Sequence, residues 1–226
     1  YKLGSLLDGS YIPEPVSWVC GRFKLGTESN GGYKNISLSN CTFMYSSGLA
    51  FEEVDQGIME NITVSNITMN HVHHYPIYIT TGCRNRGPKE RTTVSTGRDI
   101  MISNMVANDV DSLAGIIVTG MPDEPLRNIT LSNIQLQFRG GGRAELAKRE
   151  YREQGKNYPE PRFAKETPAY GLFARHVDGL EVNNVTFRTM KPEYRPAAML
   201  VDVKNESITN LKADLQKGAK LIVKKK

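Results

Sequence analysis

One short phrase recurs five times along this chain and limits the folds that the chain can adopt. Each copy places apolar residues at every second position and ends with Asn. The copies begin 26, 38, 29 and 51 residues apart, which suits a repeat structure whose turns carry loops of unequal length. The copies are Asn35-Ile-Ser-Leu-Ser-Asn40, Asn61-Ile-Thr-Val-Ser-Asn66, Asp99-Ile-Met-Ile-Ser-Asn104, Asn128-Ile-Thr-Leu-Ser-Asn133 and Gly179-Leu-Glu-Val-Asn-Asn184.

The alternation within each phrase predicts a β-strand, because successive side chains of a strand point to opposite faces. A second β-rich segment follows each phrase, at 48–51, 76–79, 114–118, 170–173 and 197–201. Repeats of this kind stack in parallel with equivalent residues about 4.8 Å apart. We therefore predict an all-β parallel β-helix with a column of Ile36, Ile62, Ile100 and Ile129 inside it.

The Asn that ends each phrase predicts an internal ladder of side chains at a bend. Asn tolerates left-handed backbone, and its amide can bond to the equivalent Asn of the next repeat. The alternative is N-glycosylation, because Asn35, Asn40, Asn61, Asn66, Asn128, Asn184 and Asn205 begin Asn-x-Ser/Thr sequences. We favour the ladder, since repetition of the strand phrase produces such sequences automatically.

Composition excludes two classes of partner. The net charge of +5 belongs to residues 212–226, which hold six Lys and one Asp, so the rest of the chain is neutral and offers no basic surface for nucleic acid. No apolar run approaches the roughly 20 residues of a membrane helix.

The three Cys lie far apart and show no spacing typical of zinc. We expect no cofactor, and the oligomeric state stays open.

Three parts are expected along the chain. Residues 1–210 form a partial parallel β-helix, a loop insertion occupies 139–167, and 211–226 form a basic C-terminal tail, frayed or capping. The insertion holds helix formers at 144–154, and Tyr158-Pro-Glu-Pro161 predicts an extended segment. It either walls one side of a cleft or decorates the surface. The chain opens without Met or an apolar leader, so we expect that N-terminal coils are missing.

Alignment of the repeats predicts two rows of outward side chains. Leu25, Phe51, Ile79 and Val118 share an inward column. The first outer row is then Lys24, Ala50, Tyr78 and Ile117, and the second outer row is Gly26, Glu52, Thr80 and Thr119. We expect these rows to form the floor of a groove. A Lys24–Glu52 ion pair that serves only the stack is the alternative.

Several longer motifs point to a family. The stretches Cys20-Gly-Arg-Phe-Lys-Leu-Gly-Thr-Glu-Ser-Asn-Gly-Gly32, Gly48-Leu-Ala-Phe-Glu-Glu-Val-Asp-Gln-Gly57 and Pro168-Ala-Tyr-Gly-Leu-Phe-Ala-Arg-His-Val177, with Lys191-Pro-Glu-Tyr-Arg-Pro-Ala197, resemble the polygalacturonase-like glycoside hydrolases, in their bacterial branch. The resemblance covers nearly the whole chain except the basic tail. It implies a right-handed, pectin lyase-like β-helix, inverting hydrolysis of a pectin-like plant cell-wall polysaccharide, and a secreted or periplasmic location.

The chain departs from the family pattern at two motifs. Gly21 stands where the family has the His that orients its catalytic acids, and Ala50-Phe51-Glu52 stands where the family has a basic clamp for a sugar carboxylate. We therefore predict a neutral or differently presented sugar at this subsite, because Glu52 repels an anion. The family's catalytic Asp residues have no counterpart here, which suggests that they lie upstream.

Glu52 is the candidate catalytic residue that remains, paired with Asp55 or with an acid on another coil, as an acid and base or as a calcium site. Glu53 is excluded as its partner, since neighbouring residues on a strand face opposite ways. His71 and His73 suggest a metal site or, more simply, a sugar-contacting rim. The predicted substrate contacts are Arg22, Lys24, Glu28, His73, Tyr75, Tyr78, Thr80 and Arg84.

Three functions fit the sequence. The first is a glycosidase of the polygalacturonase type, although the chain alone lacks that family's catalytic Asp residues. The second is a non-catalytic β-helix that binds glycans or serves as a spacer. The third is a polysaccharide lyase, which uses a Lys or Arg base with calcium.

Overall fold

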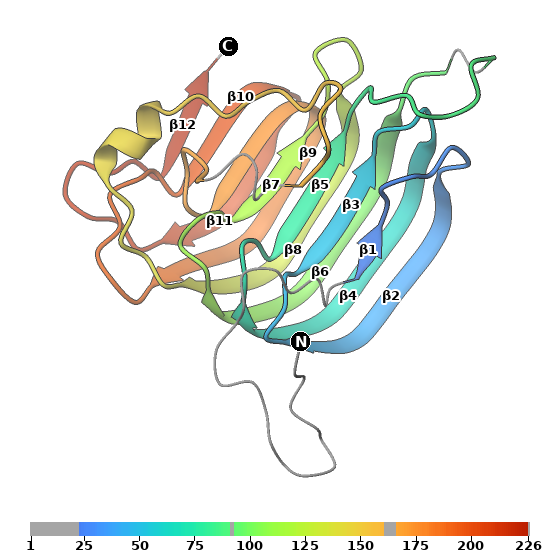
Figure 1. Ribbon diagram of the computed structural model, residues 1–226. Helices are drawn as coiled ribbons and strands as arrows, with labels where there is room; N and C mark the ends of the chain where they lie inside the picture. Colours follow the sequence, from blue (N-terminus) through green and yellow to red (C-terminus); the bar gives the residue numbers. More distant parts are fainter. Residues whose placement is uncertain (1–22, 91–92, 161–165, 226) are drawn as a thin grey trace.

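The computed structural model describes residues 23–90, 93–160 and 166–225, which fold as one all-β unit with a single short helix (Figure 1). Arg22, Gly21 and Cys20, named above, lie outside the described residues. A 3-10 helix, η1, spans Ala144–Lys148. The strands are β1 (Lys24–Leu25), β2 (Tyr33–Met44), β3 (Leu49–Glu53), β4 (Ile58–Val72), β5 (Ile77–Thr81), β6 (Thr96–Val110), β7 (Ile116–Thr119), β8 (Leu126–Phe138), β9 (Leu172–Thr189), β10 (Ala198–Lys204), β11 (Ser207–Ala213) and β12 (Ile222–Lys225).

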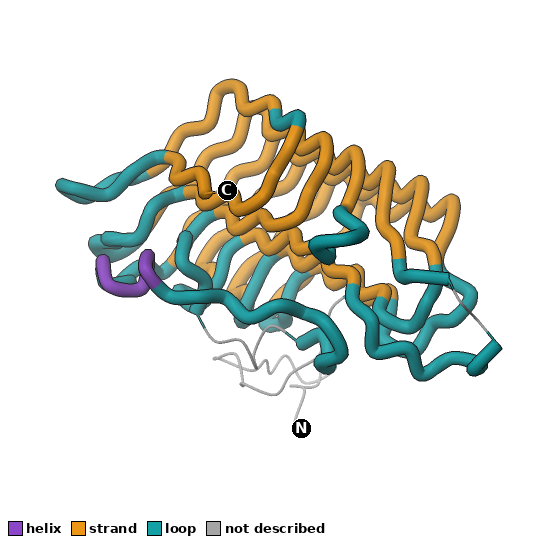
Figure 2. Tube along the Cα trace, turned by 90° about the horizontal axis from the view of Figure 1, so that it is seen from above, coloured by secondary structure: helices purple, strands orange, loops and turns teal. Residues whose placement is uncertain are grey.

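All strand pairs in the sheet are parallel, as the repeats predict. The long strands pair in the order β2-β4-β6-β8-β9, and the short strands in the order β1-β3-β5-β7-β9. β9 belongs to both series, because its first residues pair with β7 and its remaining residues pair with β8. One sheet therefore bends round the core, and successive repeats lie side by side along it (Figure 2).

The predicted apolar columns are confirmed residue by residue. Ile36 pairs with Ile62, Ile62 with Ile100, and Ile100 with Ile129. On the other side of the core, Phe51 pairs with Leu25 and with Ile79. Ile62, Ile100, Ile129, Phe51 and Ile79 are at most 1% exposed. Burial of these stacked side chains is the main stabilising contribution to the fold.

The predicted Asn ladder is present, with left-handed backbone and hydrogen bonds between successive Asn side chains, but it does not lie inside the protein. Its rungs have φ between 53° and 58°, in the left-handed region. Each amide donates to the carbonyl oxygen of the preceding rung, for example Asn133 to Asn104 at 3.0 Å and Asn184 to Asn133 at 2.8 Å. The prediction that the ladder is internal is wrong, because these bonds lie on the solvent-exposed surface. The bend requires a residue that accepts positive φ, and this requirement is independent of burial.

Both ends of the insertion at 139–167 are bound by a buried ion pair between Glu193 and Arg195. Glu193 and Arg195 are each 1% exposed, and the Arg195 guanidinium also donates to the carbonyl oxygens of Ser112, Leu113 and Thr167. The N–H of Gly142 donates to Glu193 at 3.0 Å, and a Cβ at Gly142 would lie 2.1 Å from the same carboxylate. Only glycine fits this close approach, so the anchor fixes the start of the insertion.

The insertion and the C-terminus both differ from expectation. Of the helix formers at 144–154, only Ala144–Lys148 are helical. The sheet extends beyond residue 210, where the sequence placed the start of a tail, because β11 reaches Ala213 and β12 pairs with β10. Within the described ranges, the chain forms no helix with the length and apolar character needed to span a bilayer.

Candidate functional site

The two outer rows align as predicted. In the first outer row, Ala50 pairs with Lys24 and Tyr78, and Tyr78 pairs with Ile117. In the second outer row, Thr80 pairs with Glu52 and Thr119. The register extends both rows toward the C-terminus, the first by Phe173, Met199 and Val223 and the second by Arg175, Val201 and Lys225.

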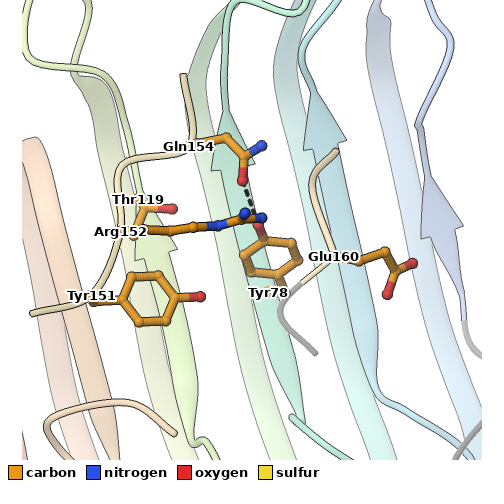
Figure 3. A pocket seen from close by; sticks show the side chains of 6 residues that line it. All are labelled: Tyr78, Thr119, Tyr151, Arg152, Gln154 and Glu160. Atoms are coloured by element: carbon orange, nitrogen blue, oxygen red, sulfur yellow. Dashed lines mark hydrogen bonds between the residues drawn. The ribbon is translucent and has the colours of Figure 1, made fainter. Parts of the chain in front are cut away.

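The middle of these rows is covered by residues 151–160 of the insertion. Tyr151 packs on Phe173 with 5.0 Å between ring centroids. Figure 3 shows the second contact, in which the Tyr78 hydroxyl donates to Gln154 at 3.2 Å. Arg175 donates to the carbonyl oxygens of residues 151 and 152, at 2.6 and 2.8 Å. The alternative that the insertion only decorates the surface is therefore wrong for this segment.

The predicted groove floor is accordingly buried. Glu52 and Thr80 are 0% exposed and Tyr78 is 2% exposed. The space between the floor and the insertion is a cavity of about 10 Å³, lined by Tyr78, Thr119, Tyr151, Arg152, Gln154 and Glu160. This volume holds one water molecule, not a sugar. The correction has a simple cause: repeat alignment shows which side chains face outward, but it does not show what packs over them.

Burial also changes the acidity of the tyrosines beside this cavity. Desolvation raises the pKa of Tyr78 well above its ordinary value, and the nearby Tyr151 and Glu52 raise it further. Desolvation raises the pKa of Tyr151 to about 12, although the positive charge of Arg175 acts in the opposite direction. Both hydroxyls therefore stay protonated at neutral pH, and that of Tyr78 donates to Gln154.

Two carboxylates from distant parts of the chain meet at Lys24. Its ammonium lies 2.7 Å from Glu52 on β3 and 3.3 Å from Glu160 in the insertion. Thr27 donates to Glu52 at 3.2 Å, and the Tyr158 ring lies 5.8 Å from the ammonium. The N–H of Glu160 donates to the carbonyl oxygen of Tyr158 at 2.9 Å, so the chain turns at Pro159 and both flanking side chains approach Lys24. Lys24 and Glu52 thus form the predicted ion pair, but in a buried cluster.

Asp55 does not join this cluster. It is 0% exposed and is bound by the Arg84 side chain and by the N–H of Arg86. Burial alone opposes ionisation of Asp55, but these hydrogen bonds outweigh it and hold the pKa below its ordinary value. Arg84, predicted to contact sugar, has a side chain only 5% exposed, because it is bound to Asp55.

The remaining predicted residues lie apart from the Lys24 cluster. Glu53 accepts the N–H groups of Asp55 and Gly57, both at 3.0 Å, so it stabilises a turn and faces away from Glu52 as predicted. Glu28 is 68% exposed and contacts the Arg86 side chain. Tyr75 is 1% exposed and packs against Tyr78.

The histidines form a second polar cluster at the corner that follows β4. His71 lies 2.5 Å from Asp109, and Arg139 donates to the same carboxylate at 2.6 Å. Hydrogen bonding by Arg139 outweighs burial and lowers the pKa of Asp109. His73 lies 3.6 Å from Asp111. In the part of the chain that the structure describes, no three His, Cys, Asp or Glu side chains come close enough to hold a metal ion.

Sequence reasoning missed the side chains that cover the rows. Gln154 and Glu160 have no repeat partner, and only the extended Tyr158-Pro-Glu-Pro161 pattern marked their neighbourhood. Arg175 could have been found, because the phrase register places it in line with Thr119. Comparison of the chain with protein-family models, curated proteins and solved structures gives no match.

Proposed function

We propose that this protein is a carbohydrate-active right-handed parallel β-helix of the pectin lyase-like type, working as an inverting glycoside hydrolase on a pectin-like polysaccharide. The proposal places the enzyme outside the cytoplasm, secreted or periplasmic, where such a polymer is found. It is supported by the sequence motifs that resemble polygalacturonase-like enzymes and by the parallel register of the repeats. That register places Lys24 and Glu52 on one outer face, beside the segment of the insertion that bears Tyr158 and Glu160.

The main structural support is the Lys24 cluster. Glycoside hydrolysis needs carboxyl groups that act as general acid and general base. Glu52 and Glu160 both contact one ammonium group. Glu52 is contacted by the Lys24 ammonium at 2.7 Å and accepts the Thr27 hydroxyl at 3.2 Å, and these contacts orient its carboxyl group as a base that activates water requires. The proposal assigns that role to Glu52 and assigns sugar contacts to Lys24 and Tyr158.

The test measures release of reducing sugar from a panel of plant cell-wall polysaccharides, followed by NMR of the first product to show whether the anomeric configuration inverts. Glu52→Gln preserves the shape of the side chain and removes its charge, so kcat should fall at least about 100-fold. Glu181→Gln is the matched control, since Glu181 is exposed on β9 and lies outside the cluster. Unchanged turnover in Glu52→Gln rejects the assignment, and an unsaturated product that absorbs ultraviolet light identifies a lyase instead.

A second candidate function is non-catalytic glycan binding by the same β-helix. The specific observation in its favour is the burial of Tyr78 and Thr119 beneath the insertion, where the cavity of about 10 Å³ has no room for a sugar. Oligosaccharide binding without release of sugar from any polymer in the panel selects this function over the hydrolase.

A further inference from the structure

A larger cavity lies at the C-terminal end of the outer rows. It has a volume of about 420 Å³ and lies between η1 and β12. Figure 1 shows η1, in yellow, beside the end of the sheet that β10 and β12 form. Met199 and Val223 provide its floor, and these residues continue the first outer row. The cavity therefore belongs to the face that bears the Lys24 cluster, but no residue of 151–160 lines it.

The lining of this cavity has one sign of charge. Lys148, Lys220 and Lys225 line it, and none of the described residues around it is Asp or Glu. The contrast with the Lys24 cluster is direct, because there two carboxylates lie within 3.3 Å of a single ammonium. Three like charges around one concave surface raise the local concentration of anions.

The walls also offer contacts to the body of a ligand. Tyr194 lines the cavity and is 46% exposed, so its ring is accessible at the mouth. Met199 is 2% exposed and forms an apolar base. Rings of Tyr and apolar floors suit the C–H face of a sugar, while ammonium groups suit its acid substituents.

The position of the cavity relates it to the proposed active site. β3, which bears Glu52, and β12, which bears Lys225, are separated by five strand spacings, about 24 Å along the sheet. Residues 151–160 cover the rows between these two places, so the cavity is a separate site on the same face. The two ends differ in charge: Glu52 is acidic, whereas the C-terminal cavity is basic.

We propose that this C-terminal cavity binds an acidic oligosaccharide, with Lys148, Lys220 and Lys225 contacting its carboxylate or sulfate groups and Tyr194 contacting a sugar ring. The assignment rests on the proposed glycan function and deepens it: the glycan bears acid groups, and these bind in a cavity separate from Glu52. The cavity and its charge are independent of the catalytic role of Glu52.

The experiment is calorimetric titration of the whole chain with three probes: trigalacturonate, maltotriose bearing sulfate esters, and unmodified maltotriose. Trigalacturonate binding with no detectable maltotriose binding is expected, and the sulfated probe shows whether sulfate replaces carboxylate. The double variant Lys220→Gln, Lys225→Gln should weaken binding of the acidic probe about tenfold, since an exposed charge contact contributes up to about fivefold. Raising the salt concentration should weaken the wild-type interaction in the same direction.

The matched control is Lys212→Gln, Lys217→Gln, which removes two exposed charges from the same terminal segment without touching the cavity. It should change affinity less than twofold. Equal affinities of the two double variants, equal binding of maltotriose, or no binding of either acidic probe overturns the assignment. Binding that depends on Lys220 and Lys225 without release of sugar from any polymer keeps this site and rejects the hydrolase. Sugar release with an affinity unchanged in Lys220→Gln, Lys225→Gln keeps the hydrolase and rejects this site.

Discussion

Replacement of Arg195 by Met tests how the insertion is held. The guanidinium is 1% exposed and donates to both oxygens of Glu193, each at 2.9 Å. It also donates to three backbone carbonyl oxygens, at distances of 2.6 to 3.3 Å. Met fills much of the same volume but makes none of these bonds. Glu193 then stays buried as an uncompensated negative charge.

The expected cost follows from these contacts. Removal of one partner from a buried ion pair costs about 3–5 kcal/mol. The unpaired carbonyl oxygens add to this cost, although such losses are not additive. We expect the free energy of unfolding to fall by about 4 kcal/mol. For a chain of this size, that corresponds to a decrease of about 8–16 °C in Tm.

Circular dichroism during thermal and urea unfolding measures this change. Arg188→Met is the control, because Arg188 is exposed on β9 and should shift stability by less than about 0.5 kcal/mol. In the double variant Glu193→Gln, Arg195→Met the buried charge is gone, so about 2 kcal/mol should be recovered relative to Arg195→Met. A loss below about 1 kcal/mol in Arg195→Met, or no recovery in the double variant, refutes the argument.

Three further predictions concern the ladder and two ionisable groups. Asn104 has φ of 54°, so Asn104→Ala should cost about 1–2 kcal/mol in urea unfolding and Asn104→Gly about 1 kcal/mol less; equal losses would contradict the role of the left-handed bend. Burial raises the pKa of Tyr151 to about 12, so the contribution of the protonated hydroxyl to the free energy of unfolding is present below pH 10 and is lost toward pH 12. Tyr151→Phe should therefore reduce the fall in the free energy of unfolding between pH 10 and 12 by about 3 kcal/mol. Asp109 has a lowered pKa, so its contribution to the free energy of unfolding is present above pH 3.8 and is lost as the pH falls further. Asp109→Asn removes the charged contacts to His71 and Arg139 and should therefore make the loss of stability in acid less steep. An unchanged dependence of stability on pH would argue against this ion cluster.

The repeat phrase predicted the parts of the structure that repeat. The pairs Ile62–Ile100 and Glu52–Thr80 follow from counting within the phrases, because a stack converts equal position in the repeat into contact. The bends at Asn104 were predicted for the same reason. The sequence did not show which side of the bend faces solvent, since the left-handed conformation favours Asn in either case.

The candidate site could not be predicted from the repeats, because one of its residues lies outside them. Lys24 and Glu160 are 136 positions apart, and Glu160 belongs to an insertion with no equivalent in the other repeats. No periodicity relates such residues, so their contact depends on how the insertion packs. The Glu193–Arg195 anchor is equally hidden, because charged residues two positions apart look like an exposed turn in sequence. Burial of a charge is a tertiary property and leaves no local pattern.

The unequal lengths of the connecting segments have an evolutionary consequence. The chain passes from Thr119, at the end of β7, to Leu172, at the start of β9, through β8 and the whole insertion, yet Ile117 still pairs in register with Phe173. The segments that connect the strands can therefore gain residues without changing how the strands pair. Evolution can therefore replace the insertion that covers one face of the β-helix, and change which ligand binds there, while the strands beneath it keep their geometry.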